Sequence, residues 1–446
     1  MSLPNLSRRT FLKSASVASA ATVAFPHVMR SQGGVSPNSR LNIACVGVGG
    51  RGANAVEAVK GENLVAFCDV DEARAAKTFA AHPDVPRFQD YRQMFDKLGN
   101  SIDAVTVSTP DHMHFPIAMV AMALGKHVFV EKPMAHTVEE ARILAKVARE
   151  KKLATQMGNQ GHAAEGTRLL KEWYQAGVLG DIVEVHSWTN RPIWPQGVNA
   201  PDHSKLVPVV PKTLQWDLWL GVAAQRAYDP AYAPFNWRGY WDFGTGALGD
   251  MGCHQMDGGF YAFDLEAPKS VNAVSAKATA ISAPAASVVT YEFAARANRP
   301  AMTWMWYDGS MRPSLGPWFE EGRHMPDNST FIIGTKASVM ADANYFTVRI
   351  VPETKMKELA PSLPAKTIPR IPGGDHFMEW VGACKGGTPA GANFDYASRL
   401  TEMVLLSNVA VRARRKIEWD SAAMKITNVE SANQFLTKQY RPGFGV

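Results

Sequence analysis

The chain has 446 residues, of which 46% are hydrophobic and 20% are charged. These values are typical of a folded protein with two or three domains, and they exclude a disordered, collagen-like or coiled-coil chain. The 47 basic and 41 acidic residues give a formal net charge of +6, but residues 1–33 hold four basic residues and no acidic one. Without that segment the charge is nearly balanced, which argues against a nucleic acid as partner.

The first 33 residues have the pattern of an export signal. Residues 7–13 read SRRTFLK, and an Ala-rich, weakly apolar run follows at 15–25. This segment resembles a bacterial twin-arginine signal peptide, so we expect the twin-arginine export machinery as a partner and a periplasmic or other extracytoplasmic location. The alternatives are a short amphipathic helix or a retained anchor. No later stretch predicts a stable membrane span.

From residue 41 onward, short β-rich runs alternate with helical stretches. The runs lie at 41–46, 64–68, 104–108 and 127–130, and the helical stretches at 51–60, 71–81, 91–97, 114–124 and 137–150. Alternation of this kind indicates parallel strands covered by helices on both faces. We therefore predict an α/β protein whose residues 34–160 form a doubly wound Rossmann domain.

The pattern changes after about residue 160. A predicted helix at 163–176 and a strand at 182–190 precede a Pro- and Trp-rich segment. Alternating runs then follow at 270–279, 287–294, 300–307, 329–340 and 345–351, with further helices at 375–385 and 395–413. Strands without intervening helices favour an antiparallel arrangement. Residues 161–420 are thus predicted to form an α+β domain with a large, mostly antiparallel open sheet for substrate binding and oligomerisation, followed by a C-terminal segment at 421–446.

A glycine motif, GVGGRG at residues 47–52, follows the first predicted strand and opens the first predicted helix. In this context Gly47 makes a tight turn, Gly49 lets the backbone approach a pyrophosphate, and Gly52 allows helix and strand to pack closely. Asp69 ends the next strand, where a carboxylate binds ribose hydroxyls and repels a 2′-phosphate. The motif predicts NAD as cofactor, with NADP less favoured, and its alternative is a Gly-rich turn in another α/β protein.

Two further motifs end the predicted strands at 104–108 and 127–130, STPDHMH at 108–114 and EKP at 131–133, and a later stretch at 250–257 reads DMGCHQMD. Together with the glycine motif they resemble the Gfo/Idh/MocA family of nicotinamide-dependent sugar oxidoreductases over residues 40–420. The resemblance implies that Lys132 contacts the nicotinamide ribose and the substrate, that the Lys132–Pro133 bond can be cis, and that Asp250 and His254 complete the active site. The residues expected to bind the cofactor are Gly47, Gly49, Gly50, Arg51, Gly52, Asp69, Thr109, Pro110, His114, Glu131 and Lys132.

The three predicted catalytic residues suit the oxidation of an alcohol. A hydroxyl group that loses hydride must also lose its proton, and His254 is the natural base near neutral pH. Asp250 can orient the imidazole or the substrate, while Lys132 can stabilise developing alkoxide. The alternative is a histidine packed at a domain interface and a surface lysine. A metal site is not predicted, because the two histidines of the 108–114 motif have no Cys or His companion at ligand spacing.

Tryptophans gather before residue 250, at Trp188, Trp194, Trp216, Trp219, Trp237 and Trp241. Sugar rings stack on indoles, so a carbohydrate site is plausible, with polar partners among His186, Asn190, Arg191, Asp202, His203, Asp217, Asn236 and Arg238. For any single tryptophan, core packing is the stronger interpretation. Trp304 and Trp306 share one face of a predicted strand, and a partner subunit covering that face would make the protein a dimeric or tetrameric homo-oligomer.

These observations predict an exported NAD-dependent oxidoreductase that acts on a hydroxyl of a sugar, sugar derivative or cyclitol, with a tightly bound cofactor recycled internally. One alternative is an NAD-dependent glycosidase, which oxidises, eliminates and reduces; in such enzymes the stretch before the histidine carries an amide where this chain has Asp250. The other alternative is a non-catalytic regulator that binds a sugar or a dinucleotide. The presence of Lys132, Asp250 and His254 together disfavours the regulator.

Overall fold

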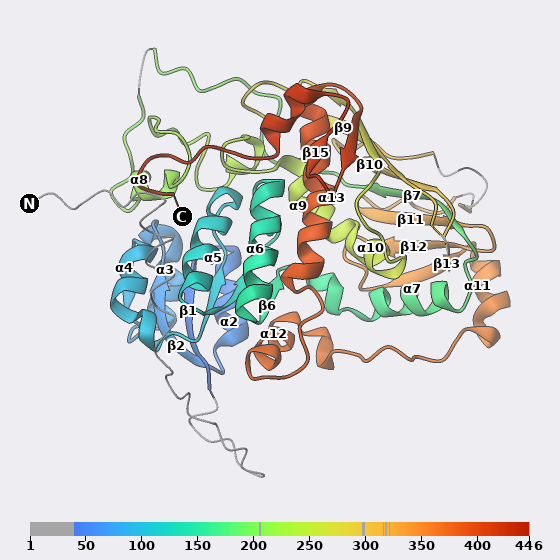
Figure 1. Ribbon diagram of the computed structural model, residues 1–446, viewed down its shortest axis with the longest axis horizontal. Coiled ribbons are helices and arrows are strands. Elements are labelled where there is room, and N and C mark those ends of the chain that lie inside the picture. Colours follow the sequence, from blue (N-terminus) through green and yellow to red (C-terminus); the bar gives the residue numbers. More distant parts are fainter. Residues whose placement is uncertain are drawn as a thin grey trace, which may run out of the picture. The chain divides into compact units, whose positions relative to one another are not determined.

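The computed structural model describes residues 40–204, 207–296, 299–314, 316, 319–320 and 322–445 (Figure 1). The predicted signal at 1–33 lies outside these residues. Among the helices of the described part of the chain, none has both the length and the hydropathy to cross a bilayer.

The first sheet has six parallel strands in the order β3-β2-β1-β4-β5-β6. The strands are β1 (Asn42–Val46), β2 (Asn63–Cys68), β3 (Arg87–Phe88), β4 (Ala104–Val107), β5 (His127–Val130) and β6 (Thr155–Met157), and the helices between them are α2 (Arg51–Val59), α3 (Glu72–Ala81), α4 (Tyr91–Leu98), α5 (His114–Ala123) and α6 (Val138–Lys151). This is the predicted Rossmann sheet.

Both faces of this sheet are buried, which explains why its strands appear in the sequence as continuous apolar runs. Along β1, Ala44 and Val46 pack into one hydrophobic cluster, while Ile43 and Cys45 pack into another on the opposite face. Three of these helices, α3, α4 and α6, begin at a polar residue whose side chain accepts a hydrogen bond from the first turn. Thr137, for example, caps α6 in a reciprocal arrangement with Glu140.

The second sheet has nine strands in the order β13-β12-β11-β7-β10-β9-β8-β14-β15. They are β7 (Ile182–Trp188), β8 (Ser270–Ala276), β9 (Ala286–Phe293), β10 (Met302–Tyr307), β11 (Ser329–Gly334), β12 (Ser338–Asp342), β13 (Val348–Val351), β14 (Ile417–Asp420) and β15 (Lys425–Ile426). The sheet is mostly antiparallel as predicted, with β10 and β7 as a parallel pair. The segment 421–446 is not separate from this sheet, because its β15 pairs with β14.

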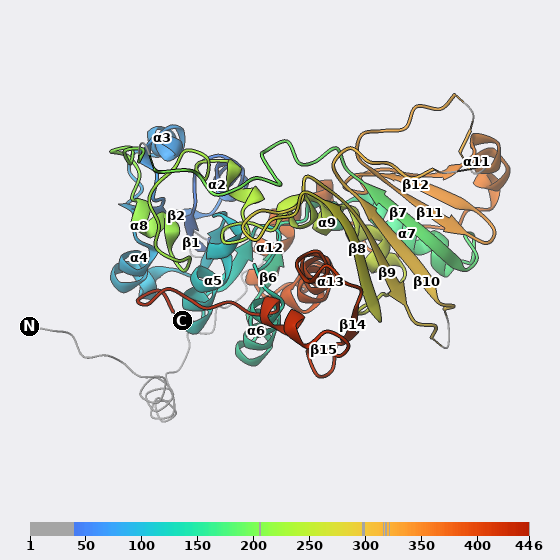
Figure 2. The same cartoon turned by 90° about the horizontal axis from the view of Figure 1, so that it is seen from above.

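The remaining helices are α7 (Glu165–Gln175), α8 (Trp216–Leu220), α9 (Gly246–Gln255), α10 (Asp257–Ala262), α11 (Glu353–Leu359), α12 (His376–Cys384) and α13 (Phe394–Ala413). The long helix α13 packs against α6 of the Rossmann sheet and against β8 of the second sheet (Figure 2). It thereby joins the two sheets into one unit.

Trp304 and Trp306 do not form the open face from which an oligomer was inferred. Both side chains are fully buried within the chain. Trp304 Nε1 donates to Ser187 Oγ at 3.0 Å, and a Cβ at Gly259 of α10 would lie 2.6 Å from the Trp304 ring. Helices of the same chain therefore cover this face, and the homo-oligomer stays a prediction without support from these two residues.

Candidate active site

The carboxyl ends of β1, β2, β4 and β5 open into a cavity of about 350 Å³. Its wall combines the glycine loop, the loops that follow these strands, helix α9 and part of the Trp-rich segment. In doubly wound sheets this edge is where ligands bind.

The glycine loop is shaped as the motif predicts. Gly47 has φ +75° and donates its N–H to Cys68 O at 2.8 Å, and a Cβ there would lie 2.7 Å from Ser108 O. A Cβ at Gly52 would overlap the backbone oxygen of Gly47. Only glycine fits these two positions, and the resulting cradle at the start of α2 suits the pyrophosphate of a dinucleotide.

Asp69 lines the cavity beside this loop and also holds the loop in place. Its Oδ2 accepts hydrogen bonds from Val48 N at 2.9 Å and Gly49 N at 3.1 Å, and its Oδ1 accepts from Asp71 N at 3.0 Å. Burial raises the pKa of Asp69, and these backbone donors act in the opposite direction. Oδ1 retains a lone pair for a ribose hydroxyl, so the side chain can anchor the loop and bind the cofactor together.

The other residues predicted to bind the cofactor divide into two groups. Arg51, Thr109, Pro110, Glu131 and Lys132 line the cavity with Gly47, Gly49 and Asp69, whereas Gly50, Gly52 and His114 do not. Arg51 Nε pairs with Glu131 Oε1 at 2.9 Å.

His114 joins two loops of the cavity from behind. Its ring nitrogens lie 2.8 Å from Pro133 O and 2.8 Å from Thr109 O, so neither is available to a ligand. In the structure His114 therefore positions the loops, whereas the sequence suggested that it lies beside the cofactor. The neighbouring Lys132–Pro133 bond is cis.

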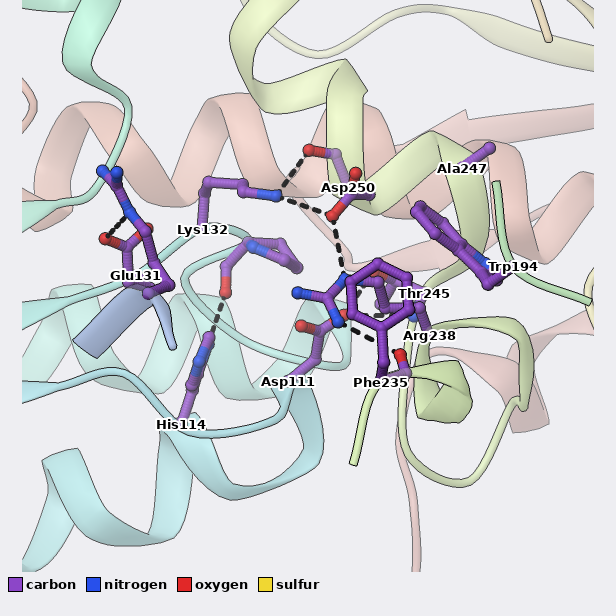
Figure 3. A network of polar contacts seen from close by, with 12 residues as sticks. Asp111, His114, Glu131, Lys132, Trp194, Phe235, Arg238, Thr245, Ala247 and Asp250 are labelled. Carbon is purple, nitrogen blue, oxygen red and sulfur yellow. Dashed lines mark hydrogen bonds and ion pairs between the residues drawn. The ribbon is translucent and has the colours of Figure 1, made fainter. Parts of the chain in front are cut away.

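The three predicted catalytic residues meet in this cavity. Lys132 Nζ donates to Asp250 O at 2.6 Å and to Asp250 Oδ1 at 2.9 Å (Figure 3). Arg238 Nε approaches the same Oδ1 at 3.3 Å. Burial alone would raise the pKa of Asp250, but the charges of Lys132 and Arg238 outweigh it and lower that pKa to about 2. Asp250 is therefore a permanent carboxylate that holds the ammonium group of Lys132 in place.

His254 lies one helical turn after Asp250 on α9 and also faces the cavity. Burial, followed by the positive charge of Lys132, lowers its pKa to about 3, so the ring is neutral near pH 7. Its Nδ1 is buried and has no hydrogen-bond partner in the described part of the chain. The other ring nitrogen, Nε2, is not buried in this way and forms no hydrogen bond in the described chain, so it can meet a molecule bound in the cavity.

Asp111 lines the cavity but was not among the predicted site residues, although it belongs to the STPDHMH motif. It is only 5% exposed, and its Oδ2 accepts from Thr245 N at 3.1 Å and Thr245 Oγ1 at 2.6 Å. Burial raises the pKa of Asp111, with His114 and the Thr245 hydroxyl acting against that rise. Its position directly after a strand, at the ligand-binding edge of the sheet, was the signal that could have identified it.

The Trp-rich segment contributes fewer side chains than its composition suggested. Trp219 and Trp237 line the cavity, and Trp194 lies beside it, 5.8 Å from the Arg238 guanidinium (Figure 3). Trp188, Trp216 and Trp241 pack elsewhere. Of the polar candidates only Arg238 lines the cavity; those that do not are His186, Asn190, Arg191, Asp202, His203, Asp217 and Asn236.

Comparisons with known proteins agree with this architecture. Residues 41–159 match the Gfo/Idh/MocA model described as an oxidoreductase family with an NAD-binding Rossmann fold, and residues 170–297 match that family's C-terminal alpha/beta domain. The two matches cover more than half of the chain.

Among curated proteins, the chain is similar to a glycosyl hydrolase family 109 protein of Solibacter usitatus, with 36% identity over 151 residues, which is 30% of this chain and 34% of that protein. It is also similar to glycosyl hydrolase family 109 protein 1 of Shewanella sp. strain ANA-3, with 33% identity over 208 residues, or 40% of this chain and 45% of that protein. The chain thus matches less than half the length of these relatives.

Solved structures share the fold at low identity. The WlbA dehydrogenase of Bordetella pertussis, solved with NADH and UDP-GlcNAcA, has a TM-score of 0.59 at 17% identity, covering 85% of this chain and 99% of that one. A levoglucosan dehydrogenase, solved with NADH and levoglucosan, has a TM-score of 0.56 at 18% identity, covering 85% and 99%. From its motifs, its two domains and these matches, the chain belongs to the Gfo/Idh/MocA family of oxidoreductases and carries that family's NAD-binding Rossmann domain.

Proposed function

We propose that the protein is an NAD-dependent oxidoreductase that oxidises a hydroxyl group of a sugar, a sugar derivative or a cyclitol. The observation that carries the proposal is the meeting of Lys132, ionised Asp250 and neutral His254 in the cavity that holds the glycine cradle. Levoglucosan dehydrogenase and the WlbA dehydrogenase, whose folds are similar, were solved with a sugar derivative and NADH, which supports a carbohydrate as substrate.

The residues suit the removal of a proton and a hydride from one C–OH group. NAD, when bound, takes up the hydride from the carbon. His254 accepts the hydroxyl proton as the C=O bond forms, through Nε2, because Nδ1 is buried and cannot reach a substrate in the cavity. Lys132, fixed by Asp250, stabilises the negative charge that develops on the oxygen.

Two further groups can hold the carbohydrate. Asp111 presents Oδ1, which accepts no hydrogen bond within the described chain, to a substrate hydroxyl. Trp219 and Trp237 offer apolar ring faces on which the C–H face of a sugar can pack. Lys132 and Arg238 are matched by Asp111 and Asp250, so the charges around this end of the cavity are balanced.

Redox-neutral cleavage of a glycoside is the second candidate, and the two glycosyl hydrolase family 109 relatives support it. In this route the hydroxyl carbon is first oxidised, and a base then removes the proton from the neighbouring carbon. The glycosidic C–O bond breaks, its electron pair leaves on the aglycone oxygen, and that oxygen takes a proton. Water adds to the new double bond and the hydride returns to the carbonyl carbon, so the net reaction is hydrolysis. The carboxylate of Asp250, in place of an amide, is the departure that counts against this route.

Export with the cofactor aboard is part of the proposal. The pattern at residues 7–13 supports passage of a folded protein, and NAD is made in the cytoplasm. An exported enzyme then has little free NAD with which to exchange, so we propose that the nucleotide stays bound and is reoxidised within the protein. Replacing Arg8 and Arg9 with Lys should retain the protein in the cytoplasm, and normal export of that variant would contradict this part.

One experiment separates the two candidate reactions. The purified protein is incubated with free sugars and with glycosides in deuterated water, without an added electron acceptor. A keto-sugar formed in equal amount with a reduced second carbonyl compound, or with reduced bound nucleotide, indicates the oxidoreductase. Release of aglycone with deuterium at the carbon beside the oxidised one indicates the glycosidase. If the bound nucleotide stays oxidised and no carbohydrate changes mass, both are contradicted.

A further inference from the structure

The order of the strands determines which end of the cavity takes which half of a dinucleotide. The cradle for the pyrophosphate follows β1, in the middle of the order β3-β2-β1-β4-β5-β6. Lys132 follows β5 on one side, and Asp69 follows β2 on the other. The adenosine half therefore extends towards the ends of β2 and β3, where Gln89, Asp90 and Tyr91 line the cavity.

A segment of the Trp-rich region, outside the Rossmann sheet, is bonded to the end of β2 at this place. Glu72 N donates to Thr213 O at 3.0 Å, and Gln215 N donates to Val70 O at 2.9 Å. Helix α8 follows directly, and its Leu218 and Trp219 line the cavity. Residues 213–219 of the same chain thus form the wall of the cavity on the side of the adenosine half.

The C-terminal strap, residues 437–445, crosses to the same place. In Figure 1 it runs, in dark red, from the region of β15 to a position beside α8 and α4. Arg441 ties the strap to α8 and the turn after it, because its backbone N donates to Val222 O at 3.0 Å and its side chain donates to Gly221 O at 2.9 Å and Asp217 O at 2.8 Å.

Phe444 is the residue of the strap that reaches the cavity. It is only 7% exposed and lines the cavity together with Asp90, Tyr91 and Leu218. Its ring lies 4.5 Å from the guanidinium carbon of Arg92 and 4.3 Å from that of Arg441, and Arg92 Nη1 donates to Gly443 O at 3.1 Å. The two guanidinium groups cover the ring and hold it in position, so a ligand in the cavity would meet its exposed edge.

We propose that Phe444 packs against the adenine of bound NAD and that the strap and α8 together retain the nucleotide between turnovers. This inference rests on the proposed NAD-dependent function. Phe444 and Leu218 line the adenosine end, so movement of the strap or of α8 would widen the route by which the nucleotide leaves. Retention would then come from residues of the same chain that lie far from the glycine motif in sequence.

The test is the rate of nucleotide release from the full-length protein. Protein loaded with NADH is mixed with excess NAD, and the loss of the fluorescence of bound NADH is followed. Phe444→Ala should speed release about 5-fold or more, the low end of the range for loss of one aromatic contact with a base. Arg441→Ala, which removes the anchor without removing a residue of the cavity wall, should also speed release. Phe444→Trp should keep release slow.

Gln439→Ala is the matched control, because Gln439 is exposed, lies on the same strap and does not line this cavity. Its release rate should equal that of the wild type. Equal rates in the wild type, Phe444→Ala and Arg441→Ala would overturn the inference, even where the wild type retains NAD and is active. If the wild type fails to bind added NADH, the proposed function itself fails, and this result is distinct from the first.

Discussion

The ammonium group of Lys132 donates two hydrogen bonds to Asp250 (Figure 3). One reaches the backbone oxygen of Asp250 at 2.6 Å, and the other reaches its carboxylate at 2.9 Å. Lys132 follows β5 of the Rossmann sheet, and Asp250 belongs to α9 more than a hundred positions later. This contact therefore links the loop after β5 to α9, the helix that also carries His254. An ammonium group fixed in this way is oriented before the substrate arrives.

Removal of either reacting side chain should lower kcat/KM for carbohydrate oxidation. Lys132→Ala and His254→Ala are each expected to lose about 10²- to 10⁴-fold, the range typical of electrostatic and acid–base contributions. The amount of NAD bound should change much less. Lys146→Ala, at an exposed ion pair on α6, is the control and should retain full activity. Near-normal turnover in the Lys132 variant would contradict the mechanism.

Asp69→Ala should weaken NAD binding without creating binding of NADP. The carboxylate repels a 2′-phosphate, but it also holds the glycine loop through Val48 N and Gly49 N. Loss of this carboxylate therefore removes the repulsion of NADP and, at the same time, the hydrogen bonds that hold the glycine loop. Titration of the nucleotide-free protein with each cofactor measures both dissociation constants. NADP that binds the variant as tightly as NAD binds the wild type would show that the anchor is unimportant.

Asp111→Asn should raise KM for the carbohydrate more than it lowers kcat, because Asp111 is expected to hold a hydroxyl that does not react. Loss of a charged hydrogen bond corresponds to about 10- to 150-fold in kcat/KM. The exposed Asp202 provides a control in Asp202→Asn. Steady-state kinetics with the best carbohydrate substrate give the comparison. An unchanged KM would remove Asp111 from the substrate site.

Acid should destabilise the protein through its buried histidines. Burial lowers the pKa of His112 and His254 to about 3 and that of His376 to about 4, whereas an unfolded histidine titrates near 6.5. As the pH falls below about 6.5, the unfolded chain binds protons that the folded chain does not, so the free energy of unfolding decreases. At about pH 5 this amounts to about 2 kcal/mol for each group.

Asp308 acts in the opposite direction, because burial raises its pKa to about 6 and the folded state gains a proton there first. Burial also raises the pKa of Asp69 and Asp111, and it lowers the pKa of His127, His136 and His186. The six histidines outnumber the three carboxylates, so the net effect of acid remains destabilising. Melting temperatures at about pH 7.5 and about pH 5 measure the effect, and His376→Gln should narrow the difference between them. If the melting temperature falls by the same amount between the two pH values in the variant and the wild type, the role given to His376 is contradicted.

The sequence predicted the Rossmann strands well because both faces of that sheet are buried, which leaves unbroken apolar runs. β3 and β6 were missed, since two or three residues are too few to show a pattern. The run predicted at 329–340 is in fact two antiparallel strands, β11 and β12, and the Gly334-Thr335-Lys336 stretch between them was the turn signal that could have divided it. The partner of each strand in the second sheet, including the parallel β10–β7 pair, could not be predicted from alternation.

The resemblance to the family's motifs identified Lys132, Asp250 and His254. Arg238 reached the site through folding of the irregular Trp-rich segment, so nothing local distinguished it from the other polar candidates. Phe444 lies farther still from any motif, and only the path of the strap brings it to the cavity. Trp304 and Trp306 show the same limit, because a strand pattern reveals two faces but not which helices cover them.

The central claim is that this cavity uses bound NAD to oxidise a carbohydrate hydroxyl. The most direct measurement is a single-turnover reaction of the purified protein, with no nucleotide added, against a panel of sugars, cyclitols and glycosides. The near-ultraviolet absorbance of reduced nicotinamide and the mass of the carbohydrate are followed together. We predict that one equivalent of bound nucleotide is reduced while the substrate loses two daltons, and that His254→Ala abolishes both signals. Nucleotide that stays oxidised with every substrate, in protein shown to contain bound NAD, would contradict the account.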